Sequence, residues 1–318
     1  MKPCHDDATS ALGIDLGGSK IEARLFDAAR RELWRERIAT PQRDYAATLA
    51  AITALVARAR AQAPGTPLSI GIGTPGSPGL DGRIKNANST CLNGQALQAD
   101  LEAALGQPLA LANDANCLAL SEALDGAAVG APSVFAVILG TGVGAGIAVG
   151  GRVLAGPNGL AGEWGHNPLP SPTDDERPGP PCYCGRRGCI EAWLSGPAIA
   201  ADHVAHGGAA LGSLAIASAA AAGDPACAAT LARHTERLAR ALAVVINLLD
   251  PDAIVLAGGV SLRPGLLPDL ETRIAPHVFG LADDPPLRTR FALAAHGDAS
   301  GVRGAAWLGH ALAPPPPR

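Results

Sequence analysis

Four residues have the types and spacing of a metal site. His166 is followed by Cys182, Cys184 and Cys189, which gives the pattern His-x15-Cys-x-Cys-x4-Cys. One imidazole and three thiolates suit tetrahedral Zn²⁺, and four protein ligands leave no open position on the metal for catalysis. We therefore expect a structural zinc ion, with isolated buried thiols as the alternative. The Cys-x-Cys spacing is tighter than that of zinc fingers, so nucleic-acid binding is not expected.

Two glycine-rich segments could hold phosphate groups. The sequence GIDLGGSK runs from Gly13 to Lys20, and GTGVG runs from Gly140 to Gly144. Glycine lets backbone N–H groups approach an anion closely. Each segment lies inside a predicted hairpin rather than before a helix, so neither is a Rossmann fingerprint or a P-loop. The alternative for each is a plain hairpin turn. The expected phosphate contacts are Gly17, Gly18, Ser19, Lys20, Gly140, Thr141, Gly142 and Gly144.

Two aspartates are candidates for cation binding and proton transfer. Asp15 lies between Ile14 and Leu16 on an apolar strand, where a carboxylate needs a partner such as hydrated Mg²⁺. Asp114 lies where a predicted strand runs into a helix, and the helix N-terminus favours its ionised form. It could accept a hydroxyl proton. The alternative is a helix cap, which is the more common role of such a residue.

The elements that position these residues recur in two similar sets. A strand, a glycine turn and a second strand open each half of the chain, which suggests a duplicated α/β architecture. In the first half we expect strands within 11–27 and at 33–39, 68–73 and 109–112, with helices at 44–63 and 116–124. In the second half we expect strands at 134–139, 145–149 and 252–256, with helices at 224–249 and 301–312.

Length and composition exclude several classes of protein. The chain has 318 residues, 47% hydrophobic and 17% charged, which fits two globular domains rather than a disordered or fibrous protein. Only 3% of the residues are aromatic and the net charge is −4. These values argue against a base-stacking surface and against attraction to nucleic acid or anionic lipid. Residues 126–151 carry no charge, but Pro132 and several glycines interrupt them, so they predict two strands rather than a membrane helix.

Cysteine usage indicates a reducing compartment. The seven cysteines are odd in number and three of them cluster, which favours a metal site in the cytoplasm over a disulfide framework. The N-terminal residues show no apolar signal-peptide core. The other cysteines are expected to be packing or surface residues: Cys4, Cys91, Cys117 and Cys227.

Taken together, the motifs resemble those of the ROK family of bacterial sugar kinases, from about Leu12 to Leu308. The resemblance rests on IDLGGSK from Ile14, GTPG from Gly73, NDAN from Asn113, GTGVG from Gly140, GEWGH from Gly162 and, most specifically, CYCGRRGCIE from Cys182. Ser19 stands where the family usually has Thr and keeps the hydroxyl. Residues 86–90 and 296–307 look most like the fructokinase/mannokinase branch. The loop at 171–181 looks individual to this chain.

The resemblance implies two ribonuclease H-like domains of the actin, hexokinase and Hsp70 ATPase fold, with an interdomain cleft. An N-terminal lobe would span 1–121, with a C-terminal helix at 302–318 packing back on it. A larger lobe carrying the zinc site would span 122–301. ATP and Mg²⁺ would bind in the cleft, with Gly258 and Gly259 against the adenosine and Asp15 holding a magnesium-bound water. A cytoplasmic homodimer would fit the family.

The resemblance also assigns the sugar contacts. It makes Asp114 the general base, and it implies that His166 ligates zinc through one ring nitrogen and presents the other to the sugar. The implied sugar-binding residues are Asn88, Asn113, Asp114, Glu163, His166 and Glu191. Carboxylates and amides are the groups that bind vicinal hydroxyls. Glu163 and Glu191 have an alternative role, which is to orient the zinc-bound histidine.

The implied activity is transfer of the γ-phosphate of ATP to the 6-hydroxyl of a hexose, with fructose or mannose as the first expectation. N-acetylglucosamine kinase or glucokinase activity is the alternative within the family. A sugar-responsive repressor is the alternative from another class, but only about ten residues precede the first predicted strand, too few for the DNA-binding segment of such members. A non-catalytic sugar-binding protein is disfavoured because both glycine turns and Asp15 are present.

Overall fold

The computed structural model describes residues 9–87, 89–280 and 287–310, which divide into two compact units. Unit 1 contains the chain up to Ser121, the segment Val153–Leu160 and the chain from Asp298 onward. Unit 2 contains Glu122–Arg152 and Ala161–Gly297. Compared with the division expected from the sequence, unit 1 therefore gains a short internal segment, and its C-terminal part begins at Asp298 rather than at residue 302. Asn88, Cys4 and residues 311–318 lie outside the described residues.

Unit 1 is built on a five-stranded sheet in the order β3-β2-β1-β4-β7. Strand β1 pairs antiparallel with β2 and parallel with β4, and β4 pairs parallel with β7. The three parallel strands therefore end at one edge of the sheet, where Asp15 and Asn113 lie. The strand bounds are Ser10–Leu16 (β1), Lys20–Phe26 (β2), Glu32–Ala39 (β3), Leu68–Thr74 (β4) and Ala110–Asn113 (β7). A two-stranded hairpin consists of β5 (Ser77–Pro78) and β6 (Ile84–Lys85).

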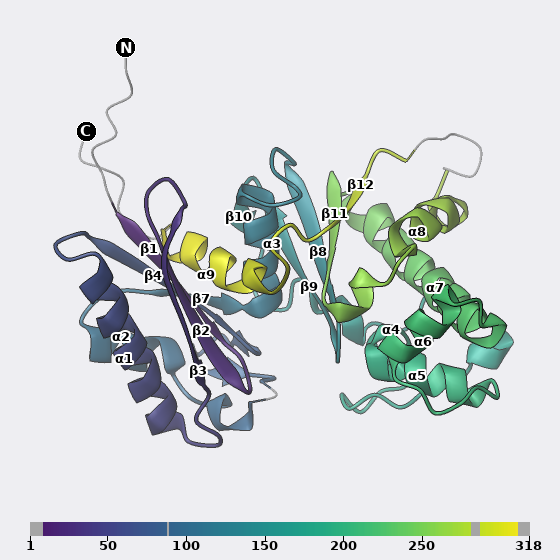
Figure 1. Ribbon diagram of the computed structural model, residues 1–318, viewed down its shortest axis with the longest axis horizontal. Coiled ribbons are helices and arrows are strands. Elements are labelled where there is room, and N and C mark those ends of the chain that lie inside the picture. Colours follow the sequence, from purple (N-terminus) through teal and green to yellow (C-terminus); the bar gives the residue numbers. More distant parts are fainter. Residues whose placement is uncertain (1–8, 88, 281–286, 311–318) are drawn as a thin grey trace, which may run out of the picture. The chain divides into compact units, whose positions relative to one another are not determined.

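The alternation of side chains along β1 decides what covers each face of this sheet. Leu12, Ile14 and Leu16 are fully buried in a core shared with helices α1 (Tyr45–Gln62) and α2 (Leu97–Leu105). These two helices lie together against the sheet (Figure 1). Asp44 caps α1, because its side chain accepts a hydrogen bond from the N–H of Ala47 at 2.9 Å.

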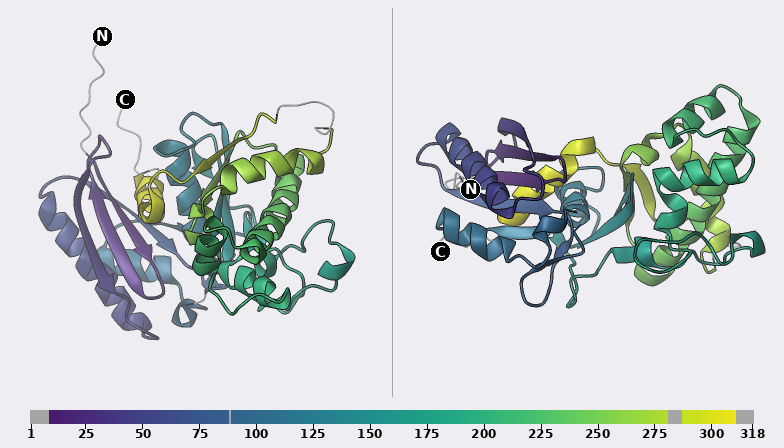
Figure 2. Two further views of the ribbon diagram at one scale, coloured as in Figure 1. Left: turned by 45° about the vertical axis from the view of Figure 1, so that its right-hand side comes forward. Right: turned by 90° about the horizontal axis from the view of Figure 1, so that it is seen from below.

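Helix α9 (Ser300–His310) packs closely on β1 and β4 because glycines on the two strands leave room for the helix backbone. Gly13 and Gly71 are register partners on the two strands. A Cβ on Gly13 would lie 1.9 Å from the carbonyl oxygen of Val302, and one on Gly71 would lie 1.8 Å from that of Ala305. The helix therefore lies directly on the strand backbones, as the three views show (Figure 1, Figure 2). This part of the glycine content serves helix packing.

Unit 2 repeats the sheet order of unit 1, as β10-β9-β8-β11-β12. Strand β8 pairs antiparallel with β9 and parallel with β11, and β11 pairs parallel with β12. The uncharged stretch at 126–151 thus supplies two buried strands around a glycine turn, as predicted. The bounds are Ser133–Leu139 (β8), Val143–Val149 (β9), Arg152–Val153 (β10), Ala253–Ala257 (β11) and Arg290–Leu293 (β12).

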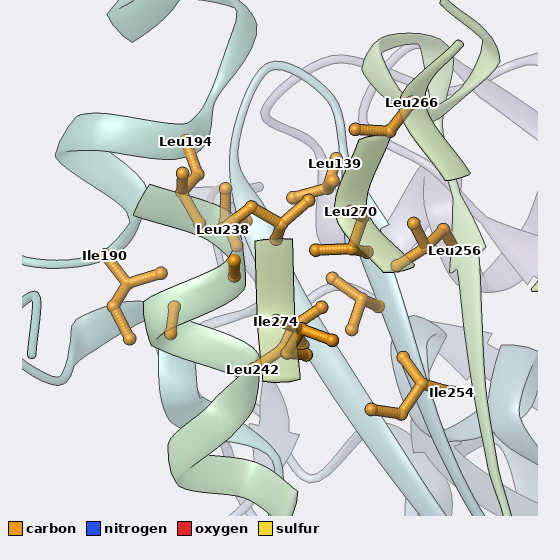
Figure 3. Close-up of a cluster of buried hydrophobic side chains, with 14 of the residues drawn as sticks. Leu139, Ile190, Leu194, Leu238, Leu242, Ile254, Leu256, Leu266, Leu270 and Ile274 are labelled. Atoms are coloured by element: carbon orange, nitrogen blue, oxygen red, sulfur yellow. The ribbon is translucent and has the colours of Figure 1, made fainter. Parts of the chain in front are cut away.

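The core of unit 2 forms where α7 (Pro225–Leu249) and α8 (Leu266–Ile274) pack against β8 and β11. Leucine and isoleucine side chains from these four elements converge in one cluster (Figure 3). Asp224 caps α7 by accepting from the N–H of Cys227 at 2.9 Å. The remaining helices are α3 (Asp114–Leu124), α4 (Glu191–Leu194), α5 (Gly196–Ala205) and α6 (Ser213–Ala221), and 3₁₀ turns include Thr90–Leu92, Glu163–His166, Asp174–Glu176 and Gly259–Leu262.

The described helices were compared with the length and hydropathy of a membrane span. No single helix in the described part of the chain is long and apolar enough to cross a bilayer. The pair α6 and α7, bent by 116°, meets the criterion of length and composition only when the two are taken together.

Candidate functional site

The glycine turn of unit 1 joins β1 to β2 and is closed by Gly17 N, which donates to the carbonyl oxygen of Lys20 at 3.0 Å. Its carbonyl oxygens are held from within the protein: Thr40 Oγ1 donates to Gly17 O and Gln42 Nε2 donates to Gly18 O, both at 2.7 Å. Gly18 and Ser19 are exposed, and within the described ranges no hydrogen bond uses their N–H groups. A turn with satisfied carbonyls and two N–H groups that the described residues leave without a partner is suited to an anion.

Asp15 lies at the edge of the same sheet, near the end of β1. Burial raises its pKa to about 6, and the negative charges of Asp114 and Glu22 add to the rise. Among the described residues its carboxylate makes no ion pair, although the charge of Lys20 partly offsets the shift. A Cβ on Gly73 or Gly301 would lie 3.7 Å from its oxygens, so both glycines pack beside it. The electrostatic need is for a cation, and hard oxygen ligands suit Mg²⁺.

Asn113 and Asp114 lie where β7 runs into α3. Asn113 Oδ1 accepts from the N–H of Ala115 at 2.9 Å, and its Nδ2 donates to the carbonyl oxygen of Gly76 at 3.1 Å. Asn113 therefore caps the helix and ties it to the loop after β4. Asp114 Oδ1 lies 2.8 Å from the same Ala115 nitrogen, but the side chain is exposed and the cap is present without it.

The glycine turn of unit 2 joins β8 to β9 and is held at both ends. Gly196 N donates to the carbonyl oxygen of Gly140 at 2.8 Å. Glu191 Oε2 accepts from the N–H of Val143 at 2.9 Å. Because Glu191 was expected to contact sugar, its bond to the turn is a contact that sequence reasoning missed.

A cavity of about 440 Å³ opens beside this turn, entirely within unit 2. It brings Gly140 and Thr141 together with Gly259, three residues that the sequence assigned to nucleotide binding. Gly258 has φ +86° and no room for a Cβ, which would lie 2.4 Å from the carbonyl oxygen of Leu139. The lining that sequence reasoning missed comes from α5, from the start of α6 and from the 3₁₀ turn after β11: Gly196, Pro197, Ala200, Gly212, Ser213, Leu214 and Val260. Small residues of this kind leave room for a flat ring system.

The predicted metal ligands converge in unit 2. Suitable atoms of His166, Cys182, Cys184 and Cys189 all lie within 4.8 Å of one another. Cys182 Sγ is 3.6 Å from His166 Nδ1, and Cys184 Sγ is 3.6 Å from Cys189 Sγ. In a tetrahedral zinc site the ligand atoms lie about 3.5–3.8 Å apart, given Zn–S near 2.3 Å and Zn–N near 2.0–2.1 Å. The donor set and these two separations therefore fit Zn²⁺.

Tyr183 occupies the side of His166 that faces away from the cysteines. Its hydroxyl lies 2.9 Å from His166 Nε2, and the two rings meet edge to face with centroids 5.1 Å apart. With a metal on Nδ1 the proton would lie on Nε2, which would then donate to this hydroxyl. Sequence reasoning expected the ring nitrogen that does not bind zinc to face the sugar. It assigned no role to Tyr183, whose only signal was its place between two ligands.

The segment carrying Glu163 lies on strand β9. A Cβ on Gly162 would lie 2.1 Å from the carbonyl oxygen of Ala145, and one on Gly165 would lie 2.1 Å from that of Val143. The two glycines thus let the backbone of Glu163–His166 pack directly on the strand. In the part of the chain that the structure describes, neither Glu163 nor Glu191 hydrogen-bonds to the His166 ring. Of the expected sugar-binding residues, unit 1 contains Asn113 and Asp114 and unit 2 contains the others except Asn88, which is not described.

The loop at 171–181 is anchored by a buried acid. Glu176 is 6% exposed and accepts from Arg237 Nε at 2.8 Å and from Arg240 Nη2 at 2.7 Å, both on α7. Arg237 also pairs with Asp202 of α5 at 2.8 Å and stacks over Trp193 at 4.4 Å. Since this loop leads into Cys182, the ion network fixes the start of the metal-binding segment.

Residues 11–311 match the sequence model of the ROK family. The chain belongs to the ROK family. It is 41% identical over 309 residues to the N-acetyl-D-glucosamine kinase of Erwinia tasmaniensis, covering 93% of this chain and 98% of the relative. The ROK hexokinase of Thermus thermophilus superposes with a TM-score of 0.82 at 32% identity, covering 95% of this chain and 98% of that one.

A further solved ROK structure supports the fold. It is the glucokinase of Streptomyces griseus in complex with glucose and AMPPNP, with a TM-score of 0.72 and 29% identity over 95% of this chain and 99% of that one. Its likeness and that of the hexokinase confirm the predicted fold class, the α/β fold of the actin and hexokinase group. These relatives do not single out the fructokinase/mannokinase branch that the sequence suggested.

Proposed function

We propose that this ROK protein is an ATP-dependent kinase that phosphorylates the 6-hydroxyl of N-acetylglucosamine. The observation that carries the proposal is the carboxylate pair of unit 1. Asp114 is exposed at the start of α3. Burial raises the pKa of Asp15 to about 6, and the negative charge of Asp114 adds to this rise. Such a pair, beside a turn with two N–H groups that the described residues leave without a partner, supplies a base, a cation site and a phosphate site.

Asp114 would act as the general base. It accepts the proton of the sugar 6-hydroxyl as that oxygen bonds to the γ-phosphorus and the bond from the γ-phosphorus to ADP breaks. The N–H groups of Gly18 and Ser19 would hold phosphate oxygens, together with the charge of Lys20. A positioned base contributes about 10²–10⁴-fold to such a reaction.

Two metals fit the side chains that are present. Mg²⁺ bound near Asp15 would neutralise phosphate charge, which is the main chemical requirement of phosphoryl transfer. Zn²⁺ held by the three cysteines and His166 would fix the segment that carries Glu163 and Glu191. In this role the zinc is structural, because all four positions are filled by the protein.

N-acetylglucosamine is proposed as the sugar because a relative at 41% identity over nearly the whole chain carries that activity in its name. Fructose or mannose was the first expectation from the sequence, and N-acetylglucosamine was the alternative. The difference between such sugars depends on a few pocket contacts of about 1–3 kcal/mol each. A direct comparison of substrates is therefore required.

The decisive experiment measures ADP release with N-acetylglucosamine, glucose, mannose, fructose and N-acetylmannosamine. We expect the highest kcat/KM with N-acetylglucosamine. A clear preference for fructose or mannose would restore the first expectation. Absence of ADP release with every sugar, together with retention of DNA in a gel-shift assay, would support the repressor alternative.

Asp114→Asn tests the base. The amide keeps the size of the side chain but cannot accept the proton, so kcat should fall about 10²–10⁴-fold while sugar affinity is retained. Asp81→Asn is the matched control, because it makes the same change at an exposed residue of the same unit. Turnover by Asp114→Asn close to that of the control would remove Asp114 from the mechanism.

A further inference from the structure

The segment between the last metal ligand and helix α5 runs directly to the glycine turn of unit 2. Cys189 is buried, and the next residue, Ile190, donates its N–H to the carbonyl oxygen of Asn167 at 2.8 Å. Glu191 then opens α4 with a half-buried side chain. The start of this segment is therefore fixed beside the cluster of predicted metal ligands. The carboxylate of Glu191 instead contacts the glycine turn.

The carboxylate of Glu191 lies against the turn rather than beside the metal ligands. Its Oε2 accepts from the N–H of Val143 at 2.9 Å. A Cβ on Gly142 would lie only 2.8 Å from the same oxygen, so only glycine fits at this position without displacing the carboxylate. Gly140 differs, since a Cβ there would meet nothing within 4 Å. The glycine at 142 is thus explained by Glu191.

The other end of the segment holds the other end of the turn. Gly196 N donates to Gly140 O at 2.8 Å, and the turn is closed on itself by Gly140 N donating to Gly142 O at 3.0 Å. Within the described ranges no hydrogen bond uses the N–H groups of Thr141 or Gly142. The bonds to Glu191 and Gly196 therefore hold the turn that carries these two N–H groups, for which the described residues provide no partner.

We propose that Glu191 is a positioning residue for the glycine turn at 140–144 and couples sugar binding to nucleotide binding within unit 2. The inference rests on the proposed function together with the sugar contact that the family resemblance implies for Glu191. A sugar hydroxyl donating to Oε1 would hold the carboxylate in the rotamer whose Oε2 accepts from Val143. With sugar bound, the turn has already lost part of its conformational freedom, so phosphate binding costs less conformational entropy. Sugar therefore tightens nucleotide binding, which is positive coupling.

Glu163 provides the matched comparison. It belongs to the same proposed sugar-binding set and the same unit, but none of the described hydrogen bonds joins its side chain to the turn. Loss of Glu163 should weaken sugar binding alone. Loss of Glu191 should weaken sugar binding and also remove the effect of sugar on the nucleotide.

The test is calorimetric titration of the full-length protein with Mg²⁺ and AMPPNP, without sugar and with saturating N-acetylglucosamine. For the unchanged protein we expect sugar to tighten AMPPNP binding roughly five- to ten-fold, and AMPPNP to tighten sugar binding by the same factor. The factor should fall to about one in Glu191→Ala and stay unchanged in Glu163→Ala. Glu191→Gln should restore part of it, because the amide oxygen can accept from Val143.

A second variant leaves the sugar-contacting carboxylate in the chain. Gly142→Ala adds the Cβ that collides with Glu191 and should also lower the coupling factor, with far-UV circular dichroism showing that the protein is folded. If Glu191→Ala and Gly142→Ala both retain the full factor, the inference is wrong even though sugar phosphorylation proceeds. If the coupling pattern holds but no sugar is phosphorylated, the proposed function fails and the positioning role stands.

Discussion

Asp15 in unit 1 and Glu176 in unit 2 are both withdrawn from water, yet their pKa values move in opposite directions. Burial raises the pKa of Asp15 to about 6, and nearby acids add to the rise. Burial also acts to raise the pKa of Glu176, but hydrogen bonds from Arg240 and Arg237 outweigh it and lower the value to about 2. Among the described residues Glu176 forms ion pairs with two arginines, whereas Asp15 forms none and only the more distant charges of Lys20 and Arg37 offset part of its shift.

The contrast separates a structural from a functional use of a buried charge. Glu176 joins a loop to α7, and both of its carboxylate oxygens accept hydrogen bonds from arginines of that helix. Asp15 lies in a sheet that is otherwise well packed, so its raised pKa is a local cost in free energy. Costs of this kind concentrate at functional sites.

The largest effect is expected for Glu176→Ala. The substitution removes the carboxylate partner of Arg240 and one of the two carboxylate partners of Arg237, the other being Asp202, and the two arginine side chains are only 8% and 4% exposed. Breaking a buried ion pair in this way costs about 3–5 kcal/mol, which should appear as a lower free energy of unfolding in urea.

Glu22→Ala in unit 1 is the control for that substitution. Glu22 also pairs with two arginines, Arg24 and Arg37, but their side chains are 14% and 49% exposed. Water can solvate them when the acid is removed, so the loss should be clearly smaller. Equal losses for the two variants would show that burial of the arginines does not set the cost.

The next effect concerns the zinc ion proposed for unit 2, whose ligands would be three thiolates and an imidazole. Cys184→Ser removes one ligand and should abolish stoichiometric zinc, measured by elemental analysis. The Glu163 segment then loses its attachment, and kcat/KM for sugar should fall about 10–100-fold. Cys91→Ser makes the same change at a half-buried thiol of unit 1 and should retain the metal. Full zinc content in Cys184→Ser would show that the four-ligand site is wrong.

Sequence patterns predicted well the features that are local. Two strand–glycine turn–strand units became β1–β2 and β8–β9, and the cap residues Asp44 and Asp224 begin helices close to the expected positions. The predicted metal ligands could also be recognised from the sequence, because three of the four lie within eight residues of one another. Each of these signals is contained in a short window of the chain.

Contacts between distant segments could not be predicted in this way. Glu176 lies in an acidic, proline-rich run that resembles a solvated loop, and its arginine partners lie 61 and 64 residues later. The bond from Val143 to Glu191 spans 48 residues. Helix α6 went unpredicted because SLAIASAAA has small or apolar residues at nearly every position and therefore no helical periodicity.

A smaller effect of opposite sign is expected for Asp15→Asn. The amide has the size of the carboxylate but carries no charge to desolvate, so the free energy of unfolding in magnesium-free buffer at pH 8 should rise by about 1–2 kcal/mol. The same variant should lose kinase activity if Asp15 serves the metal. Asp81→Asn should change neither quantity. A loss of stability in Asp15→Asn would mean that the ionised carboxylate has a cation within the protein after all.

The smallest effect is a difference in the pH range over which each carboxylate changes the free energy of unfolding. The folded pKa of Asp15 is raised from 3.8 to about 6, so its contribution to stability improves as pH falls through 6 and is complete below 3.8. The folded pKa of Glu176 is lowered from 4.5 to about 2, so its contribution is present above 4.5 and is lost as pH falls toward 2.

Urea unfolding at a series of pH values can separate the two groups. The gap between the original chain and Asp15→Asn should close mainly between pH 7 and 4, whereas the gap to Glu176→Gln should change only below 4.5. If both gaps changed over the same range, the two carboxylates would have similar surroundings. The separation of the two pH ranges therefore tests directly whether the protein pairs Glu176 with a positive charge and leaves Asp15 without one.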